Sequence, residues 1–240
     1  MIHDITATYA IGTAALALGT VVLLVTGWNA FEDKRYPGLL AGITGVAAVA
    51  YAAMTLGVGV VSVGERTVFV VRYADWLVTT PLQLAFLALV ANVASNRTAG
   101  LLAVDVVMIA GGVAATLLTV PSRFLLAGVS TVAFVVVLWQ LYGPLTAAAD
   151  GRSLRVGGYY RKLRNIVGVL WFIYPLVWAT GPAGLGLMTA ATTAVVIVYL
   201  DVISKVGFGL VAVNSSAVLL GDGTPADEPA ADAGAAPADD

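Results

Sequence analysis

Five charged side chains interrupt stretches of the sequence that are otherwise apolar: Arg72, Asp75, Asp105, Asp201 and Lys205. A charge in such surroundings is costly, and it persists where it pairs with another charge or where function requires it. Asp201 and Lys205 are four residues apart, so they share one face of a helix. Arg72 and Asp75 share a face of an earlier helix with Thr79. The spacing predicts a buried lysine flanked by two carboxylates, with an arginine nearby.

The buried lysine has two interpretations. In the first, Lys205 is part of a structural ion-pair cluster that joins two helices. In the second, it is a chemically used amine, because a lysine removed from water in an apolar pocket becomes a nucleophile that forms a Schiff base with an aldehyde. The protonated imine needs a carboxylate counter-ion, for which Asp75 and Asp201 are the candidates. We favour the second interpretation, although these residues alone do not name the aldehyde.

Aromatic side chains support a pocket beside this lysine. Trp76 adjoins Asp75, and three more rings recur at helical spacing, namely Trp171, Tyr174 and Trp178. Such a stripe ordinarily packs against a neighbouring helix. Next to a buried lysine, it favours a flat apolar slot for a conjugated ligand.

The composition excludes several other kinds of chemistry. The chain has no cysteine, which rules out disulfides, thiolate metal sites and cysteine nucleophiles, and its one histidine, His3, lies at the N-terminus. No basic region indicates nucleic-acid binding. We therefore expect neither an enzyme nor a metal site.

The helices that must position these residues are predicted to span a membrane. Of the 240 residues, 60% are hydrophobic and 11% are charged, whereas a soluble domain has about a quarter charged residues. Seven apolar runs reach the roughly 20 residues that cross a bilayer. They are Tyr9–Trp28, Pro37–Leu56, Val68–Val90, Ala99–Leu118, Arg123–Leu145, Tyr160–Thr180 and Ala190–Leu219. Continuous runs indicate helices rather than a β-barrel.

The distribution of Lys and Arg predicts the orientation of the chain in a cell membrane. The first run lacks a basic flank and is too long for a signal peptide, so we interpret it as a retained span. Loops on the side of the C-terminus carry Lys34, Arg35, Arg97, Arg152, Arg155, Arg161, Lys162 and Arg164. The other side carries Arg66, Arg72 and Arg123. We expect a seven-helix domain over residues 1–220, an extracellular N-terminus and a disordered acidic cytoplasmic tail over residues 221–240.

Three motifs resemble those of the microbial rhodopsins of archaea. The third predicted helix contains Arg72-Tyr73-Ala74-Asp75-Trp76-Leu77-Val78-Thr79-Thr80-Pro81, similar to the family pattern R-Y-x-D-W-x-x-T-T-P. The sixth contains Trp171-Phe172-Ile173-Tyr174-Pro175-Leu176-Val177-Trp178, and the seventh contains Tyr199-Leu200-Asp201-Val202-Ile203-Ser204-Lys205-Val206. The resemblance covers about residues 5–220 and leaves out the tail.

The resemblance implies all-trans retinal bound to Lys205 as a protonated Schiff base. Arg72, Asp75 and Asp201 would form its counter-ion complex, with Asp75 accepting the proton after photoisomerisation. Asp75 also argues against the chloride-pumping branch. The remaining pocket residues implied by the family are Trp76, Thr79, Thr80, Met108, Ser130, Trp171, Tyr174, Trp178 and Ser204.

At both ends of the path that a proton takes through the family's pumps, this sequence differs from the pumps. Proton pumps of the family have a second carboxylate eleven residues after the acceptor, roughly 16 Å along the helix. Here that position is Phe86, and the positions of two further glutamates near the extracellular end are Ala183 and Thr193. The resemblance therefore implies slow reprotonation and a long-lived signalling state.

Within the family, the chain is most similar to sensory rhodopsin II, also called phoborhodopsin. The similarity includes Leu40-Ala41-Gly42-Ile43-Thr44-Gly45, Arg161-Lys162-Leu163-Arg164-Asn165 and Ile203-Ser204-Lys205-Val206. This branch signals through a two-helix membrane transducer docked on its sixth and seventh helices, where Thr189 and Tyr199 match positions that contact it. The alternative for Tyr199 is a lipid-facing aromatic residue. Homo-oligomerisation stays open.

Other pocket residues point toward the pumps or toward the intermediate group called middle rhodopsins. Met108 and Ser130 are pump-like, and Ala127 replaces an aromatic residue near the ring end of retinal. Asp105 is expected to be protonated and hydrogen-bonded, because burial favours the neutral carboxyl. We expect a phototaxis photoreceptor. The alternatives are a slow outward proton pump and a bundle without photochemistry.

One more contact is predicted between the sixth and seventh helices. The hydroxyls of Ser204 and Tyr174 are expected to form a hydrogen bond that joins these helices on the transducer side. The alternative is that Ser204 bonds to its own helix backbone four residues back.

Overall fold

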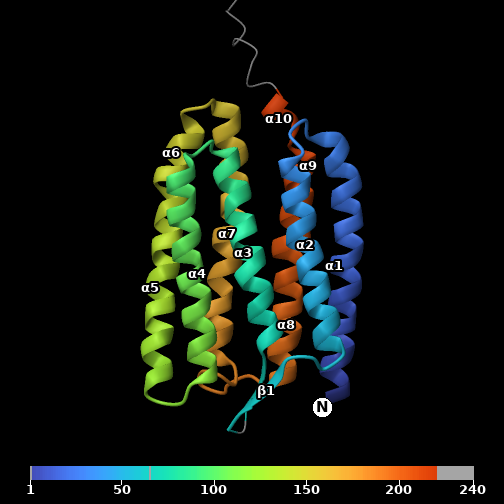
Figure 1. Cartoon of the computed structure of the whole chain (residues 1–240), viewed down its shortest axis with the longest axis vertical. Coiled ribbons are helices and arrows are strands. Elements are labelled where there is room, and N and C mark those ends of the chain that lie inside the picture. The colour runs from blue at the N-terminus through green and yellow to red at the C-terminus, as the bar shows by residue number, and fades with distance from the viewer. Residues whose placement is uncertain (1, 65, 221–240) are drawn as a thin grey trace, which may run out of the picture.

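The chain forms an elongated bundle of helices with a small β-hairpin at one end (Figure 1). The computed structural model describes residues 2–64 and 66–220, so the predicted acidic tail, residues 221–240, lies outside the described residues. The helices are α1 (Ile2–Ala30), α2 (Arg35–Thr55), α3 (Val70–Val90), α4 (Ser95–Leu117), α5 (Ser122–Tyr142), α6 (Pro144–Asp150), α7 (Leu154–Thr180), α8 (Ala190–Val202), η1 (Ile203–Gly207), α9 (Phe208–Asn214) and α10 (Ala217–Leu220). The strands are β1 (Val60–Val63) and β2 (Arg66–Phe69).

Seven helical segments of the described chain are long and apolar enough to cross a membrane, which confirms the predicted seven-helix bundle. The fifth consists of α5 and α6 together, and the seventh consists of α8, η1 and α9. Large apolar side chains such as Val49, Leu125 and Tyr199 are 72%, 72% and 67% exposed on the outside of the bundle. This outer surface suits lipid rather than water, and the protein is a multi-pass membrane protein.

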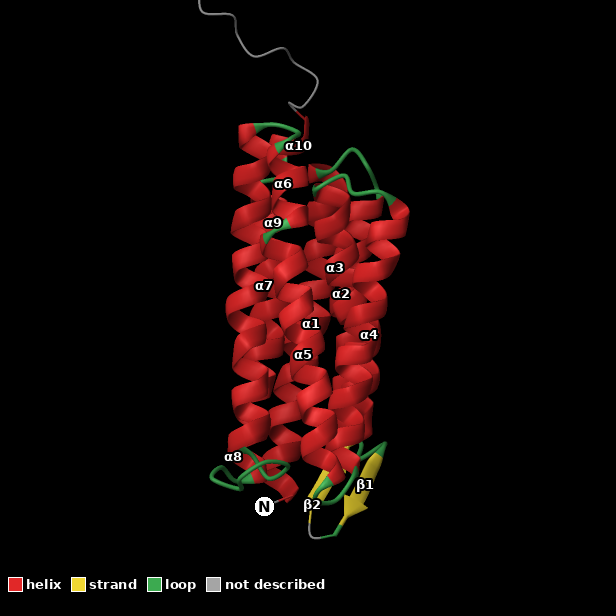
Figure 2. Ribbon diagram, turned by 90° about the vertical axis from the view of Figure 1, so that its left-hand side faces the viewer, coloured by secondary structure: helices red, strands yellow, loops and turns green. Residues whose placement is uncertain are grey.

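Neighbouring helices in the sequence are neighbours in space, and the last span packs against α1 to close the ring. α3 also contacts α7, so one face of α3 is turned toward the interior of the bundle. The N-terminal end of α1 and the strands lie at one end of the bundle, here called the hairpin end (Figure 2). α6, α10 and the Arg-rich start of α7 lie at the other, here called the basic end (Figure 1). α3 and α8 both run from the hairpin end toward the basic end.

The β-hairpin before α3 corrects the predicted start of the third span. Val68, assigned to that span, lies in β2, and the helix begins at Val70. The strands are antiparallel, with Val60 opposite Phe69. A short run of β-branched residues suits a strand as well as a membrane helix, and hydropathy does not distinguish the two. Gly64, in the turn, has φ 60°, a conformation that favours glycine.

The predicted bounds of other spans also change, most clearly in the fifth and the sixth. The sixth was predicted from Tyr160, but α7 begins at Leu154, where the Ser153 hydroxyl accepts a hydrogen bond from the Val156 N–H at 3.2 Å. The added residues before Tyr160 include Arg155 and the pair Gly157-Gly158, which lower the hydropathy of this stretch without preventing a helix. The fifth span was predicted to end at Leu145, whereas α6 continues it to Asp150 after a break at Gly143.

Candidate functional site

Lys205 is buried in the middle of the seventh span, between two carboxylates. Its Nζ lies 3.2 Å from Asp75 Oδ2, on α3, and 2.9 Å from Asp201 Oδ1, at the end of α8. The lysine side chain is 4% exposed, and those of the carboxylates are 0% and 1% exposed. Removing either carboxylate would leave a buried charge with less compensation, which is strongly destabilising. The structure therefore brings together the lysine and the two acids that the spacing predicted.

The two carboxylates differ in how fully they are hydrogen-bonded. Asp201 accepts hydrogen bonds from Tyr51 Oη at 2.5 Å, from Tyr174 Oη at 2.7 Å and from Trp76 Nε1 at 3.3 Å, besides the Lys205 contact. Asp75 contacts Lys205 through Oδ2, while its Oδ1 is buried and has no hydrogen-bond partner among the described residues. Four donors hold Asp201 as an anion, because charge-assisted hydrogen bonds favour the ionised form. Asp75 has an oxygen available to receive a proton.

Thr79 and Arg72 lie beside this cluster but do not pair with its charges. The Thr79 hydroxyl donates to the main-chain oxygen of Asp75, 3.0 Å away. Arg72 donates to Tyr9 Oη at 2.7 Å, and its guanidinium stands 5.5 Å from the centre of the Tyr9 ring. Among the described residues, no ion pair joins Arg72 to a carboxylate, and its Nε is buried without a partner. The resemblance implied a counter-ion complex that includes Arg72, but the direct contacts of this arginine are with α1.

A cavity of about 370 Å³ extends from Lys205 between α3, α4, α5 and α7. Its size is within the range of small-molecule sites, and most of its wall is apolar. The predicted pocket residues that line it are Trp76, Thr80, Met108, Ser130, Trp171, Tyr174, Trp178, Ser204 and Lys205. Thr79 is fully buried but does not line the cavity. An apolar slot that ends at a lysine amine fits a conjugated aldehyde.

Comparisons with known proteins identify the family of the chain. A family profile described as "Bacteriorhodopsin-like protein" matches residues 3–219. The chain belongs to this family. Sensory rhodopsin-2 of Natronomonas pharaonis is 40% identical over 216 residues, which cover 90% of each chain. Sensory rhodopsin-2 of Haloarcula vallismortis is 41% identical over 234 residues, 96% of this chain and 98% of the relative.

A solved structure supports the same assignment. Thermophilic rhodopsin from Rubrobacter xylanophilus superposes with a TM-score of 0.87 at 35% identity, covering 91% of this chain and 99% of the other. Membership of the bacteriorhodopsin-like family implies a retinal chromophore. The cavity fits such a group, because Lys205 closes one end and aromatic side chains of α3 and α7 flank the space beyond it.

Asp105 contacts the cavity wall through Thr80, as a neutral acid would. Thr80 Oγ1 lies 2.7 Å from Asp105 Oδ2 and 2.8 Å from the Trp76 carbonyl. The hydroxyl has one hydrogen, and the carbonyl can only accept. Both contacts are satisfied together when Asp105 keeps its own proton, which agrees with its complete burial. This arrangement favours a neutral Asp105, and its protonation stays a prediction.

Sequence reasoning missed Thr116, whose hydroxyl joins three helices at the hairpin end of the cavity. Thr116 Oγ1 lies 3.0 Å from Trp178 Nε1, which donates to it, and 2.8 Å from Tyr73 Oη. Arg66 of the hairpin donates to the Thr116 carbonyl at 3.3 Å. Threonine is common in apolar helices, so the sequence contains no signal for this junction. Gln83 and Tyr51 were missed too, although each is a buried polar side chain in a predicted span.

The predicted hydroxyl pair between Ser204 and Tyr174 is present only as a long contact. The two oxygens are 3.4 Å apart, whereas Tyr174 Oη makes its shorter bond to Asp201. Ser204 Oγ also donates to the Asp201 carbonyl at 3.3 Å, three residues back rather than four. Tyr174 is thus primarily a donor to the carboxylate, because an anion attracts its hydrogen more strongly than a neutral hydroxyl does.

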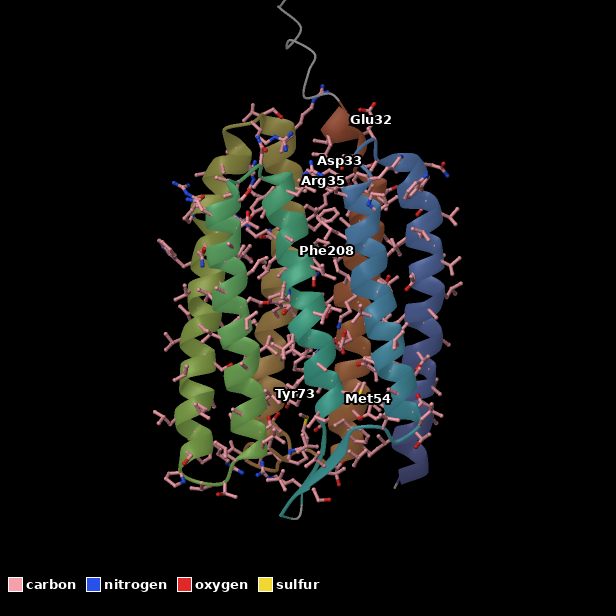
Figure 3. All side chains as sticks on the ribbon, in the orientation of Figure 1. Glu32, Asp33, Arg35, Met54, Tyr73 and Phe208 are labelled. Carbon is pink, nitrogen blue, oxygen red and sulfur yellow. The ribbon has the colours of Figure 1, made fainter. Side chains whose placement is uncertain are left out.

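An aromatic cluster surrounds Phe86 in the half of the bundle toward the basic end. The Phe86 ring packs edge to face against Tyr36 at 5.2 Å and Phe208 at 5.4 Å between centroids, and against Phe31 at 6.3 Å. Figure 3 shows Phe208 in this half and Tyr73 toward the hairpin end. Phe86 is fully buried. The Phe86 side chain cannot donate a proton. The three rings around it offer one polar group, the Tyr36 hydroxyl.

The remaining predicted residues lie outside the pocket. Ala183 is in the loop after α7, and Thr193 is in α8 with its hydroxyl buried and without a partner among the described residues. Thr189 is the N-cap of α8, and its hydroxyl accepts from the Thr192 N–H at 3.1 Å. Tyr199 is 67% exposed on the outer face of α8. The two residues predicted to meet a partner are both on the surface of the bundle.

Proposed function

We propose that the chain is a retinal-based photoreceptor that mediates phototaxis through a membrane transducer. The observation that carries this proposal is Lys205, a buried amine held between Asp75 and Asp201 at the end of an aromatic cavity. All-trans retinal joined through its aldehyde to Lys205 supplies visible absorption and a light-driven change of shape. The sensory rhodopsins that resemble the chain over nearly its whole length support this function.

One proton is held and moved by three residues, each with its own role: Lys205, Asp75 and Asp201. Asp201 stays ionised under its four donors and holds the positive charge at Nζ of Lys205. Asp75 is the acceptor, because its Oδ1 has a free lone pair and its Oδ2 already lies 3.2 Å from Nζ. Proton transfer over a hydrogen-bond distance needs no further group. Once Asp75 is neutral, the attraction between α3 and the seventh span is weaker.

The aromatic walls orient the ligand and exclude water. Trp76 on α3 and Trp171 on α7 flank the cavity, and Trp178 is held by Thr116. Met108 and Ser130 lie on the side of α4 and α5, where the small side chain of Ala127 also lines the cavity. Ser130 is itself fixed, since its hydroxyl donates to the Met108 carbonyl at 2.7 Å.

The cluster around Phe86 favours a sensor over a pump. A pump must return a proton to Nζ from the side opposite to Asp75, and a phenyl ring carries none. A slow return prolongs the state in which Asp75 is neutral, and that state is the signal. The second candidate function is a slow outward proton pump, which the pump-like Met108 and Ser130 favour.

The transducer is proposed to be a two-helix membrane protein docked along α7 and α8. Tyr199 offers an exposed aromatic ring with a hydroxyl on this face. Thr189 is a weaker candidate for a partner contact, because its hydroxyl is occupied as a helix cap. The excess of Lys and Arg at the basic end supports a cytoplasmic location for that end, and for the tail over residues 221–240.

Adding all-trans retinal to the retinal-free protein tests the photoreceptor. A visible band that appears on mixing, and that fails to form in Lys205→Ala, is the expected result. Sensor and pump are separated by illuminating vesicles that contain the protein without a transducer. Sustained transport of protons across the membrane would favour the pump, and a transient pH change that decays with the photocycle would favour the sensor.

A further inference from the structure

The backbone that carries Lys205 departs from a regular α-helix. Ile203–Gly207 form the π-helical turn η1, in which the Phe208 N–H bonds to the Ile203 carbonyl. In a regular α-helix, that N–H would bond to the carbonyl of Ser204, four residues back. The π-turn therefore removes the regular donor from the Ser204 carbonyl, which belongs to the peptide group directly before Lys205.

A side chain from another helix takes the place of that donor. Gln83 Nε2, on α3, donates to the Ser204 carbonyl at 2.8 Å. Gln83 is 2% exposed and lies between apolar neighbours on a helix that faces the centre of the bundle. A buried carbonyl without a donor is unfavourable, so the amide restores what the π-turn removes. π-turns are frequent at functional sites, where a local departure from the helix is maintained by its surroundings.

α3 consequently contacts the lysine at two points. Asp75 holds the end of its side chain, with Oδ2 at 3.2 Å from Nζ, and Gln83 holds the preceding peptide group. The two α3 residues are eight positions apart, about 12 Å along the helix axis. Asp201 does not replace this connection, because it belongs to the same span as Lys205. The Gln83 contact is therefore a link between η1 and α3 that does not depend on the charge of Asp75.

We propose that Gln83 is a positioning residue that fixes the π-turn and clamps Lys205 to α3 together with Asp75. When Asp75 becomes neutral, the Gln83 bond still holds the backbone of Lys205 in place. The lysine side chain can then move while its main chain stays attached to α3. The clamp exists in the protein without retinal, so the inference does not rest on the proposed function.

The bond can be measured directly in the retinal-free full chain in lipid nanodiscs. Serine labelled with ¹³C at the carbonyl gives isotope-edited infrared bands, and Ser204→Ala identifies the band of residue 204. Gln83→Met has a similar volume and no amide, so its Ser204 carbonyl band is expected at higher wavenumber. Gln83→Asn keeps the amide on a shorter side chain and is expected to give the same shift. Gln83→Glu at mildly acidic pH, where the carboxyl keeps its proton, is expected to return the band toward the parent position.

Hydrogen–deuterium exchange supplies a second readout with a matched control. Amides of residues 206–209 are expected to exchange on the order of tenfold faster in Gln83→Met, as loss of one buried hydrogen bond allows. Thr44→Val is the control, because Thr44 is fully buried and, within the described part of the chain, its hydroxyl bonds to its own helix alone, at the Leu40 carbonyl. It should leave both the Ser204 band and the exchange of residues 206–209 unchanged.

Two results would overturn the proposal. One is an unshifted Ser204 band with unchanged exchange in both Gln83→Met and Gln83→Asn. The other is the same change in Thr44→Val, which would mean a general loosening of the bundle. Adding retinal separates this test from that of the photoreceptor. A visible band that forms in Gln83→Met while the carbonyl band is shifted supports both the photoreceptor and the clamp. The absence of a visible band in the parent chain would contradict the photoreceptor, while the infrared result would still support the clamp.

Discussion

Lys205 lies between two halves of the bundle that are lined by different side chains. Toward the hairpin end, two carboxylates and the hydroxyls of Tyr51 and Tyr174 form a continuous hydrogen-bonded cluster around Nζ. Toward the basic end, the Phe86 ring packs against the rings of Tyr36, Phe208 and Phe31. α3 passes through both halves, with Asp75 in the first and Phe86 in the second.

This difference makes the two directions of proton movement unequal. A proton that leaves Nζ toward the hairpin end meets a carboxylate oxygen within 3.2 Å. A proton that returns from the basic end must pass packed rings, which offer no carboxyl group and little room for water. Loss of the proton should therefore be fast and its return slow. The following predictions test each half, beginning with the residue between them.

Lys205→Ala should abolish the visible absorption completely, because no other amine of the described residues lies in the cavity. The retinal-treated protein would be measured by absorption spectroscopy before and after washing with hydroxylamine. Lys162→Ala is the matched control, since Lys162 is exposed at the basic end and contacts Ser215 at 3.4 Å. A visible band in Lys205→Ala that survives hydroxylamine would show that the attachment site is elsewhere.

Asp75→Asn should shift the absorption of the retinal-loaded protein strongly to the red. The carboxylate stabilises a positive charge located at Nζ, and excitation moves that charge away along the polyene, so removal of the carboxylate raises the ground state more than the excited state. Asp105→Asn is the control, and only a slight shift is expected if that acid is neutral beside Thr80, as its burial predicts. If Asp75→Asn left the spectrum unchanged, Asp201 alone would be the effective counter-ion.

Phe86→Asp should speed the return of the proton to Nζ, on the order of a hundredfold, as a positioned general acid typically does. Flash photolysis with and without azide measures this step. Phe86→Leu removes the ring without adding an acid, and it should change the rate little. An equal acceleration in both variants would identify the packed ring, rather than the missing donor, as the barrier. No acceleration in either would place the barrier in the rings that remain, Tyr36, Phe208 and Phe31.

The sequence was sufficient to predict the number of spans and the charges at the centre of the site. Intramembrane charges are rare, so the spacing of Asp201 and Lys205 and the position of Asp75 carried a strong signal. The hairpin before α3 was not predictable in this way, because its valines and threonine satisfy the hydropathy of a span as well as the propensity of a strand. The extra length of α7 was missed because Arg155 and the pair Gly157-Gly158 lower the hydropathy of its first turns.

Contacts between residues distant in the sequence were beyond prediction from a single chain. Arg72 was placed with the carboxylates on the basis of its helical face, but the Tyr9 hydroxyl of α1 lies closer to it. The sequence does not mark Thr116 or Gln83 as special. Their partners, the Trp178 ring and the Ser204 carbonyl of the π-turn, come from other helices. Periodicity indicates which face of a helix is buried, and it does not indicate which partner that face meets.

Ser204→Ala is expected to have the smallest effect of these changes, a modest weakening of the light-driven swimming response. The Ser204 hydroxyl contacts Tyr174 only at 3.4 Å, while Tyr174 donates to Asp201 at 2.7 Å. Tyr174→Phe should therefore weaken the response more, because it removes both hydrogen bonds that the Tyr174 hydroxyl makes to the seventh span. Swimming would be tracked in cells that carry the cognate transducer, with variant and parent compared at equal absorbed light. A normal response in Ser204→Ala together with a weakened one in Tyr174→Phe would assign the coupling to the Tyr174–Asp201 bond. Normal responses in both would show that neither hydroxyl transmits the signal.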